Sequence, residues 1–158
     1  MDDPTFSLVK LYKILFYSDF EADGRFGEPI TGRAYRKLPM GPAPASSKEM
    51  LARMQQEGLI KIVERAVYDR SRQRVVPLRE PDYDLFNAKQ ISIVDTWIRF
   101  FWNMTAKRVS QYSHGKAWEI APMYELIPYE AVFISDDPIT EEDVSRVKEL
   151  AAKYKWKM

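Results

Sequence analysis

The chain holds few of the residue types that enzymes use for nucleophilic or metal-dependent catalysis. It contains one histidine, His114, and no cysteine. A Ser-His-Asp triad would have to use His114, and adjacency of Ser113 in sequence does not make one. The absence of cysteine excludes disulfides, zinc–cysteine sites and thiolate nucleophiles. Helix capping or another satisfied polar contact is the simpler role for His114, so we expect a protein that is not an enzyme.

The carboxylates and glycines match no cofactor site. Asp19, Glu21 and Asp23 alternate along the chain, and two more acids stand at 136–137, but neither group has the spacing of a calcium loop. Three glycines between residues 24 and 32 fit neither a dinucleotide-binding fingerprint nor a P-loop. We therefore predict solvated carboxylates, turn-forming glycines and no metal or other cofactor.

Arginines gather in one short stretch, at positions 65, 70, 72, 74 and 79, with few acids between them. A winged-helix protein could set such arginines against DNA phosphates. The preceding segment, 46–57, carries Glu49 and Glu57, which would repel phosphates. The whole chain has 24 Lys plus Arg against 23 Asp plus Glu, so it has no general attraction to nucleic acid or to acidic membranes. We favour an arginine surface for an acidic protein partner, with DNA binding as the alternative.

Length and composition suit one soluble globular domain spanning residues 1–158. Hydrophobic residues make up 46% of the 158 residues and charged residues 30%. No apolar run reaches the length of a membrane span, and the acidic start, Met1-Asp2-Asp3-Pro4, is unlike a secretory signal. We expect a cytoplasmic protein without membrane contact.

Hydrophobic periodicity predicts two central helices and a β wing. Residues 6–20 are apolar nearly all round a helix, with glycines from Gly24 onward ending it, so this helix should lie at the centre of the fold. A helix from Ser46, with Glu49 completing a capping box, precedes strands at 59–63 and 74–78. Residues 87–102 should form a second deeply buried helix, begun by Asn87 and Gln90.

The rest of the chain should be shorter elements and one last helix. A helix is expected over 106–112 and an extended segment over 129–134. Acids at 141–143 favour the start of a C-terminal helix over about 140–155. Its inner stripe should be Val144, Val147, Ala151 and Tyr154. The predicted fold class is mainly α with a small β-hairpin wing, that is, α+β.

Four ordered motifs resemble the Panacea domain of SocA-like antitoxins. They are the opening helix 10–19, the Pro-Ile-Thr-Gly segment 29–32, the Gly-Pro-x-Pro element 41–44, and the later Ser-His and Trp landmarks. Order and spacing agree over 10–60, and more loosely over 86–120. The residues that carry the resemblance are Asp19, Pro29, Gly32, Tyr35, Gly41, Pro42, His114 and Trp118.

The resemblance implies a compact helical Panacea-type domain that acts as the antitoxin of a toxin–antitoxin pair, a kind common in prophages. Such antitoxins neutralise a cognate protein toxin by direct binding. One member is also a proteolytic adaptor that delivers its toxin to the ClpXP protease, so a protease of this type is a second implied partner. A winged-helix transcriptional repressor is the alternative function.

The motif residues have a simpler role as scaffold, because glycines and prolines shape turns and Tyr35 and Trp118 suit packing. Partner contacts should then come from other surfaces. The candidates are Arg65, Arg70, Arg72 and Arg74 of the wing and Lys153 and Tyr154 of the last helix.

Overall fold

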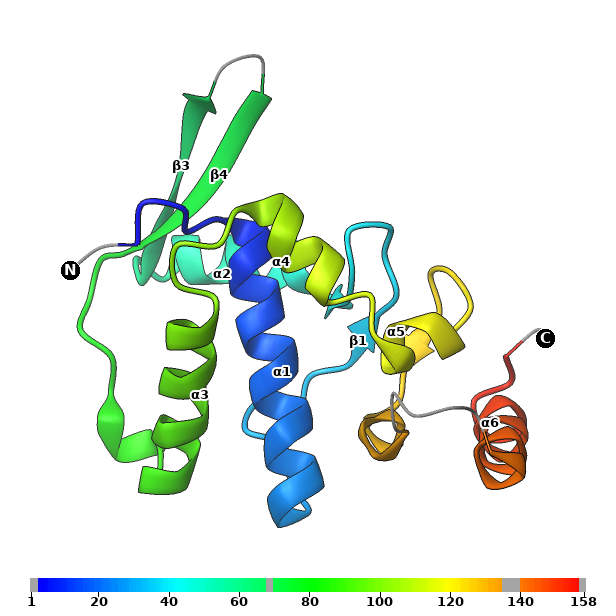
Figure 1. Cartoon of the computed structure of the whole chain (residues 1–158). Coiled ribbons are helices and arrows are strands. Elements are labelled where there is room, and N and C mark those ends of the chain that lie inside the picture. Colours follow the sequence, from blue (N-terminus) through cyan, green and yellow to red (C-terminus); the bar gives the residue numbers. More distant parts are fainter. Residues whose placement is uncertain (1–2, 68–69, 135–139, 157–158) are drawn as a thin grey trace.

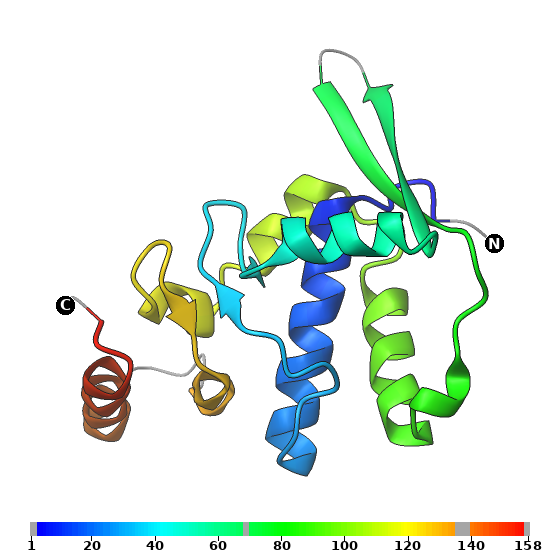
Figure 2. The ribbon, with the colours of Figure 1, turned by 180° about the vertical axis from the view of Figure 1, so that it is seen from behind.

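A computed structural model of the chain describes residues 3–67, 70–134 and 140–156. Helix α1 lies at the centre, between α3 on one side and α5 and η2 on the other, with α4 near its N-terminal end (Figure 1). Seen from behind, α2 crosses the same end of α1 (Figure 2). The elements are α1 Leu8–Phe26, β1 Tyr35–Arg36, β2 Ala43–Pro44, α2 Ser47–Gln56, β3 Ile60–Val67, β4 Arg70–Pro77, η1 Tyr83–Leu85, α3 Ala88–Phe100, α4 Ala106–Tyr112, α5 Lys116–Ile120, β5 Leu126–Ile127, η2 Tyr129–Phe133 and α6 Glu141–Lys153.

Helix α1 is longer than the sequence predicted. Ser7 caps its start by accepting a hydrogen bond from the Lys10 amide, and Gly27 ends it with φ +78°. The expectation that Gly24 ends the helix is wrong. A Cβ at Gly24 would lie 3.3 Å from a methyl carbon of Val132, so this glycine lets η2 pack closely against an intact helix.

Two apolar clusters use opposite sides of α1. The first joins Phe16 and Phe20 of α1 to Tyr35 and to Leu150 and Trp156 near the C-terminus. The second joins Ile14 to Phe101 and Val109, and the partly buried side chains packed around it are Phe6, Tyr17, Val94, Trp97 and Met104. The prediction that the first helix is central is therefore confirmed.

The prediction that residues 87–102 form a deeply buried helix is wrong. Asn87 and Gln90 do form the predicted capping box. Of the described side chains in α3, however, Ile93 is the one that is fully buried, and Ile91, Ile98 and Phe100 are exposed. Helix α3 packs mainly on α1 and touches α4 through Phe100 and Tyr112, and apolar residues on its other sides face outward.

Three smaller predictions are also wrong. Ser46 precedes α2 but its side chain makes no capping hydrogen bond, so the capping box with Glu49 is absent. Residues 129–133 form a 3₁₀-helix, because Pro128 leads into a turn closed by the Ala131 amide on the Pro128 carbonyl. The predicted inner stripe of the last helix is wrong at Val144, which is exposed, whereas Ala151 is buried and Val147 and Tyr154 are half-buried as predicted.

The strands form two separate antiparallel sheets. Short strands β2, β1 and β5 pair side by side, with Tyr35 opposite both Pro44 and Ile127. Strands β3 and β4 form a hairpin that projects beyond the helices (Figure 1). It is longer than the predicted strands at 59–63 and 74–78. The predicted fold class, mainly α with a β-hairpin wing, is confirmed. No helix among the described residues is both long and apolar enough to cross a membrane.

Two glycines with left-handed backbone differ sharply in their surroundings. Gly27 has φ +78° and a Cβ there would meet no atom within 4 Å. Gly41 has φ +97°, and its Cβ would lie 2.1 Å from Ser113 Oγ and 2.8 Å from Lys13 Cε. At Gly27 a side chain would meet only backbone strain, whereas at Gly41 it would also force apart the loop, α1 and the end of α4.

These two positions make a matched test of that close approach. We expect Gly27→Ala to lower the free energy of unfolding by about 1–2 kcal/mol, the strain of a left-handed residue. Gly41→Ala should lower it by about 3 kcal/mol or more, because overpacking adds to the strain. Chemical denaturation measures both, and equal effects at the two positions would contradict the packing described for Gly41.

Candidate functional site

Asp19 holds the turn that follows α1, and the prediction that its carboxylate is solvated is wrong. Its carboxylate is fully buried and accepts hydrogen bonds from the Thr31 amide at 2.7 Å, the Thr31 hydroxyl at 2.5 Å and the Tyr35 hydroxyl at 2.6 Å. Pro29 is half-buried and Gly32 turns the chain with φ +68°. The structure thus brings together the four predicted scaffold residues of this segment, and it adds Thr31, which sequence reasoning missed.

The charge on Asp19 affects the tyrosines beside it. Burial raises the pKa of Tyr35 far above its usual value, and the neighbouring Asp19 carboxylate raises it further. Burial likewise raises the pKa of Tyr129, with Asp19 adding to the effect. Tyr129 donates to the Arg33 carbonyl at 2.5 Å. Both phenols therefore remain protonated donors: Tyr35 ties β1 to α1, and Tyr129 ties η2 to the segment before β1.

Lys13 holds the second motif loop. Its ammonium is 2% exposed and donates to the Pro42 carbonyl at 2.7 Å. Burial lowers the pKa of Lys13 to about 7. Ser110 fixes the same loop through its hydroxyl, which donates to the Met40 carbonyl at 2.9 Å. Sequence reasoning missed the burial of Lys13.

The Ser-His pair packs as part of this scaffold. The Ser113 hydroxyl donates to the Ser110 carbonyl at 2.7 Å. The His114 ring stacks on Trp118 with 4.0 Å between ring centroids and 15° between planes. Within the described part of the chain, His114 Nε2 has no hydrogen-bond partner. No group of three metal-ligating side chains occurs in residues 3–67, 70–134 and 140–156.

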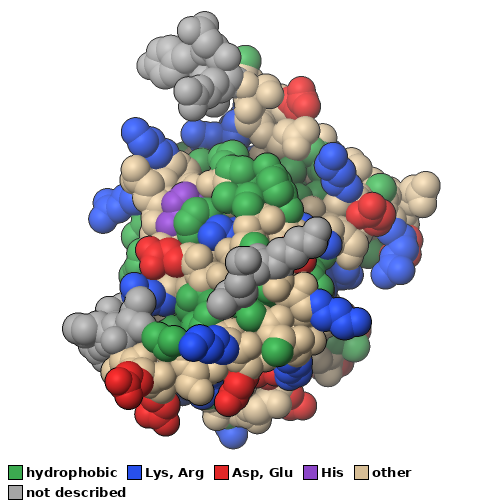
Figure 3. All heavy atoms as spheres, turned by 90° about the vertical axis from the view of Figure 1, so that its right-hand side faces the viewer, with side chains coloured by type: hydrophobic (Ala, Val, Ile, Leu, Met, Phe, Trp, Pro, Cys, Tyr) green, Lys and Arg blue, Asp and Glu red, His purple; other side chains and the backbone are tan. Residues whose placement is uncertain are grey.

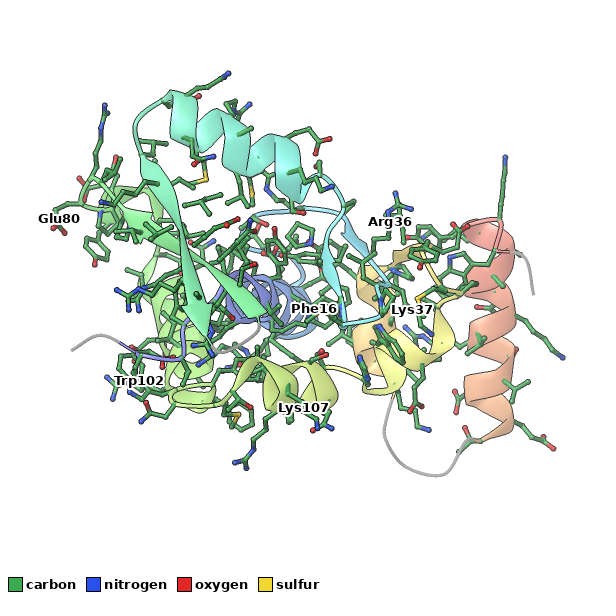
Figure 4. All side chains as sticks on the ribbon, turned by 90° about the horizontal axis from the view of Figure 1, so that it is seen from above. Phe16, Arg36, Lys37, Glu80, Trp102 and Lys107 are labelled. Atoms are coloured by element: carbon green, nitrogen blue, oxygen red, sulfur yellow. The ribbon has the colours of Figure 1, made fainter. Side chains whose placement is uncertain are left out.

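Trp118 joins α5 to the segment that follows strand β1. Its indole N–H donates to the Leu38 carbonyl at 2.9 Å, and the Lys37 ammonium lies 4.1 Å from the ring centroid. Burial lowers the pKa of Lys37, and Figure 4 shows this side chain beside α5. All eight predicted scaffold positions therefore lie at turns or contacts between elements.

An open groove of about 510 Å³ runs beside α1. Phe16 and Phe20 of α1, Trp97 of α3, Trp118 of α5 and Phe133 of η2 are among its lining residues. A further lining residue, Glu21 of α1, accepts hydrogen bonds from Arg25 and from the Trp97 indole, each at 2.7 Å. The groove is thus mainly apolar, and the Glu21–Trp97 hydrogen bond joins α1 to α3 along it.

The four arginines predicted to contact a partner through the wing all lie in strands β3 and β4. Arg65 lies directly opposite Arg72, and Arg74 lies opposite Val63. The backbone of Arg70 pairs with Val67, but its side chain lies outside what the structure describes. Since alternate strand residues share a face, the register places Lys61, Arg65, Arg72 and Arg74 on one face, called here the basic face.

The two predicted contact residues of α6 are used inside the molecule. Lys153 forms an ion pair with Glu130, and the Tyr154 hydroxyl donates to the same carboxylate at 3.2 Å. The hydrogen bond from Lys153 lowers the pKa of Glu130. Lys153 is exposed and Tyr154 half-buried. On the side of the molecule shown in Figure 3, acidic, basic and hydrophobic side chains are interspersed.

Comparison with known proteins finds a match between this chain and one protein family. A family model described as "Antitoxin SocA-like, Panacea domain" matches residues 11–119, more than half of the chain. No curated protein and no solved structure matches. The matched range begins in α1 and ends in α5, so it contains all eight scaffold residues and the hairpin, and it stops before α6.

Removing the Tyr35 hydroxyl tests the Asp19 contact. Tyr35→Phe should lower the free energy of unfolding by about 1.5–3 kcal/mol, the range for a hydrogen bond to a charged group. In an Asp19→Asn background the same change should cost about 1 kcal/mol, because the acceptor is then neutral. Tyr83→Phe, at an exposed tyrosine, is the control and should change stability by less than about 0.5 kcal/mol. An unchanged cost in the Asp19→Asn background would refute the charge-assisted bond.

The buried lysine predicts a pH dependence of stability. The pKa of Lys13 is about 7 in the folded chain against an ordinary 10.5, so between these values the unfolded state binds more protons. Stability must then rise with pH from about 7 upward, by at most about 1.4 kcal/mol per pH unit. Lys13→Met should remove this rise, and Lys48→Met, at an exposed lysine, should keep it. Denaturant unfolding from pH 7 to 9 measures the slopes; parallel curves for wild type and Lys13→Met would contradict the burial of a titrating ammonium.

Proposed function

The chain belongs to the family of SocA-like antitoxins with a Panacea domain, and we propose that it neutralises a cognate protein toxin by binding it directly. The observation that carries this proposal is the family match over residues 11–119. The structure supports it in a second way. The motif residues are engaged in contacts between elements, which leaves the hairpin and the groove available to a partner.

Neutralisation by binding requires no chemical step from this chain. Ser113 donates its hydroxyl to a backbone carbonyl and the His114 ring lies flat on Trp118, so the pair has other structural duties. A hydrolase would need the serine hydroxyl to donate to the histidine. We therefore propose a protein that acts without catalysis and without a cofactor.

The proposed partner determines the cellular compartment in which the protein acts. An antitoxin must bind a toxin that acts inside the cell in that same compartment, and a chain without cysteine suits a reducing compartment. We place the protein in the cytoplasm, acting as a single Panacea-type domain over residues 1–158. Delivery of the bound toxin to a ClpXP-type protease is a further mode of action that the same contact would allow.

Co-expression tests the function directly. The product of the neighbouring open reading frame should arrest growth when expressed alone, and the wild-type chain should restore growth and co-purify with it. Gly27→Ala should still protect, whereas Gly41→Ala should lose protection together with the fold. His114→Gln should protect as well as wild type if no catalysis is involved.

Persistent toxicity with soluble wild-type protein present, or rescue without a complex, would contradict the proposal. The toxin level separates the two modes of action. A steady level in rescued cells indicates masking, and a level that falls only when the protease is present indicates delivery for degradation.

A further inference from the structure

We propose that the basic face of the β3–β4 hairpin binds an extended acidic segment of a protein partner. This inference rests on the proposed function, under which the partner is the toxin. The face consists of Lys61, Arg65, Arg72 and Arg74, with Val63 and Val76 between them. The single occupant we commit to is a polypeptide with carboxylates at alternate positions.

The register concentrates one sign of charge on this face. Arg65 and Arg72 are cross-strand neighbours, and like charges in that position destabilise a hairpin. Glu64 of β3 lies on the opposite face, where it accepts a hydrogen bond from Gln73 at 3.1 Å. No acid of β3 or β4 therefore neutralises the basic face, and an incoming anion would relieve the repulsion.

The base of the face already contacts a turn of the chain over residues 3–6, closed by the Phe6 amide on the Asp3 carbonyl. The Arg74 and Arg72 guanidinium groups donate to the carbonyls of Asp3 and Pro4, each at 3.4 Å. The Asp3 carboxylate pairs with the buried Lys10 ammonium at 2.6 Å. Hydrogen bonds from Lys10 and Thr5 lower the pKa of Asp3 although burial opposes them. Arg72 and Arg74 thus already bind backbone carbonyls of a polypeptide segment, while the Asp3 carboxylate is taken up by Lys10 and Thr5.

The remainder of the face is open for a longer segment. Arg65 and Lys61 are exposed, and no hydrogen bond from either is found among the described residues. Seen from above, the hairpin passes over the N-terminal end of α1, between α2 and α4 (Figure 4). Alternate residues of a strand lie about 7 Å apart, and so do alternate residues of an extended peptide. A glutamate at every second position could therefore meet successive cations.

The surroundings favour a polypeptide over a nucleic acid. Helix α2 packs against β3, in the place where a winged-helix protein would carry its recognition helix. The exposed Arg53 of α2 forms an ion pair with Glu57 at 3.7 Å, and the positive charge of Lys48 is balanced by the neighbouring Glu49. Helix α2 therefore adds no net positive charge beside the hairpin. The half-buried Val63 and Val76 lie among the cations, and apolar side chains of a peptide would cover them.

The test uses a fluorescein-labelled peptide of alternating glutamate and threonine, with fluorescence anisotropy as the measurement. Wild-type protein should bind it at low ionic strength and lose affinity as salt is raised. Arg65→Gln should weaken binding by roughly fivefold to tenfold, since it removes a desolvated charge contact. Ala66→Glu changes the net charge equally, at the neighbouring exposed position on the opposite face, and should weaken binding by less than about twofold.

Three results would overturn the inference: no peptide binding at low ionic strength, equal effects of the two variants, or a DNA duplex that binds more tightly than the peptide and is lost with Arg65→Gln. The last result would assign the face to nucleic acid.

The cellular assay separates this inference from the proposed function. If Arg65→Gln combined with Arg72→Gln still neutralises the toxin fully, the basic face is not its site and the antitoxin function stands. If the wild type fails to neutralise any toxin, the antitoxin function fails, whatever the peptide does.

Discussion

The central helix buries three charged side chains, and the rest of the fold depends on how their charges are satisfied. Lys10, Lys13 and Asp19 of α1 are each almost fully buried. An ionised group inside a protein is costly unless it is paired or hydrogen-bonded. Asp19 finds its partners in the turn at Thr31 and Tyr35, Lys13 in the Pro42 carbonyl, and Lys10 in Asp3. Each contact draws a segment without regular structure onto the helix, so one helix fixes the N-terminus and both motif loops.

This arrangement separates the residues that build the domain from those that could meet a partner. The motif residues are committed to α1 and to β1, while the hairpin extends away from both apolar clusters. A family that shares such a scaffold can change its hairpin without disturbing the buried charges. Under the proposed function, a change of toxin would require variation mainly in the side chains of the hairpin, and most substitutions at a protein surface have small effects on stability.

Much of the fold could be predicted because local patterns dominate there. The apolar first helix, the Asn87 capping box and the alternation in the hairpin arise from neighbouring residues. The errors arise where tertiary contacts decide. A lysine on a helix normally predicts a solvated position, yet Lys13 is buried because a loop 29 residues away supplies its acceptor. Aromatic residues along 97–102 suggested core, yet Phe100 is exposed although its ring contacts Tyr112 of α4, because α1 and α4 cover only part of α3. The family motifs identified the scaffold residues from the sequence. That the basic side chains of the hairpin share one face could be seen only from the register of β3 and β4.

The central claim is that the scaffold holds the fold while the hairpin contacts the partner. Hydrogen–deuterium exchange on the purified complex with the toxin tests it most directly. Complex formation should slow exchange in residues 60–67 and 70–77 and leave exchange in the motif segments 29–44 unchanged. Slower exchange confined to the motif segments, with the hairpin unaffected, would contradict it.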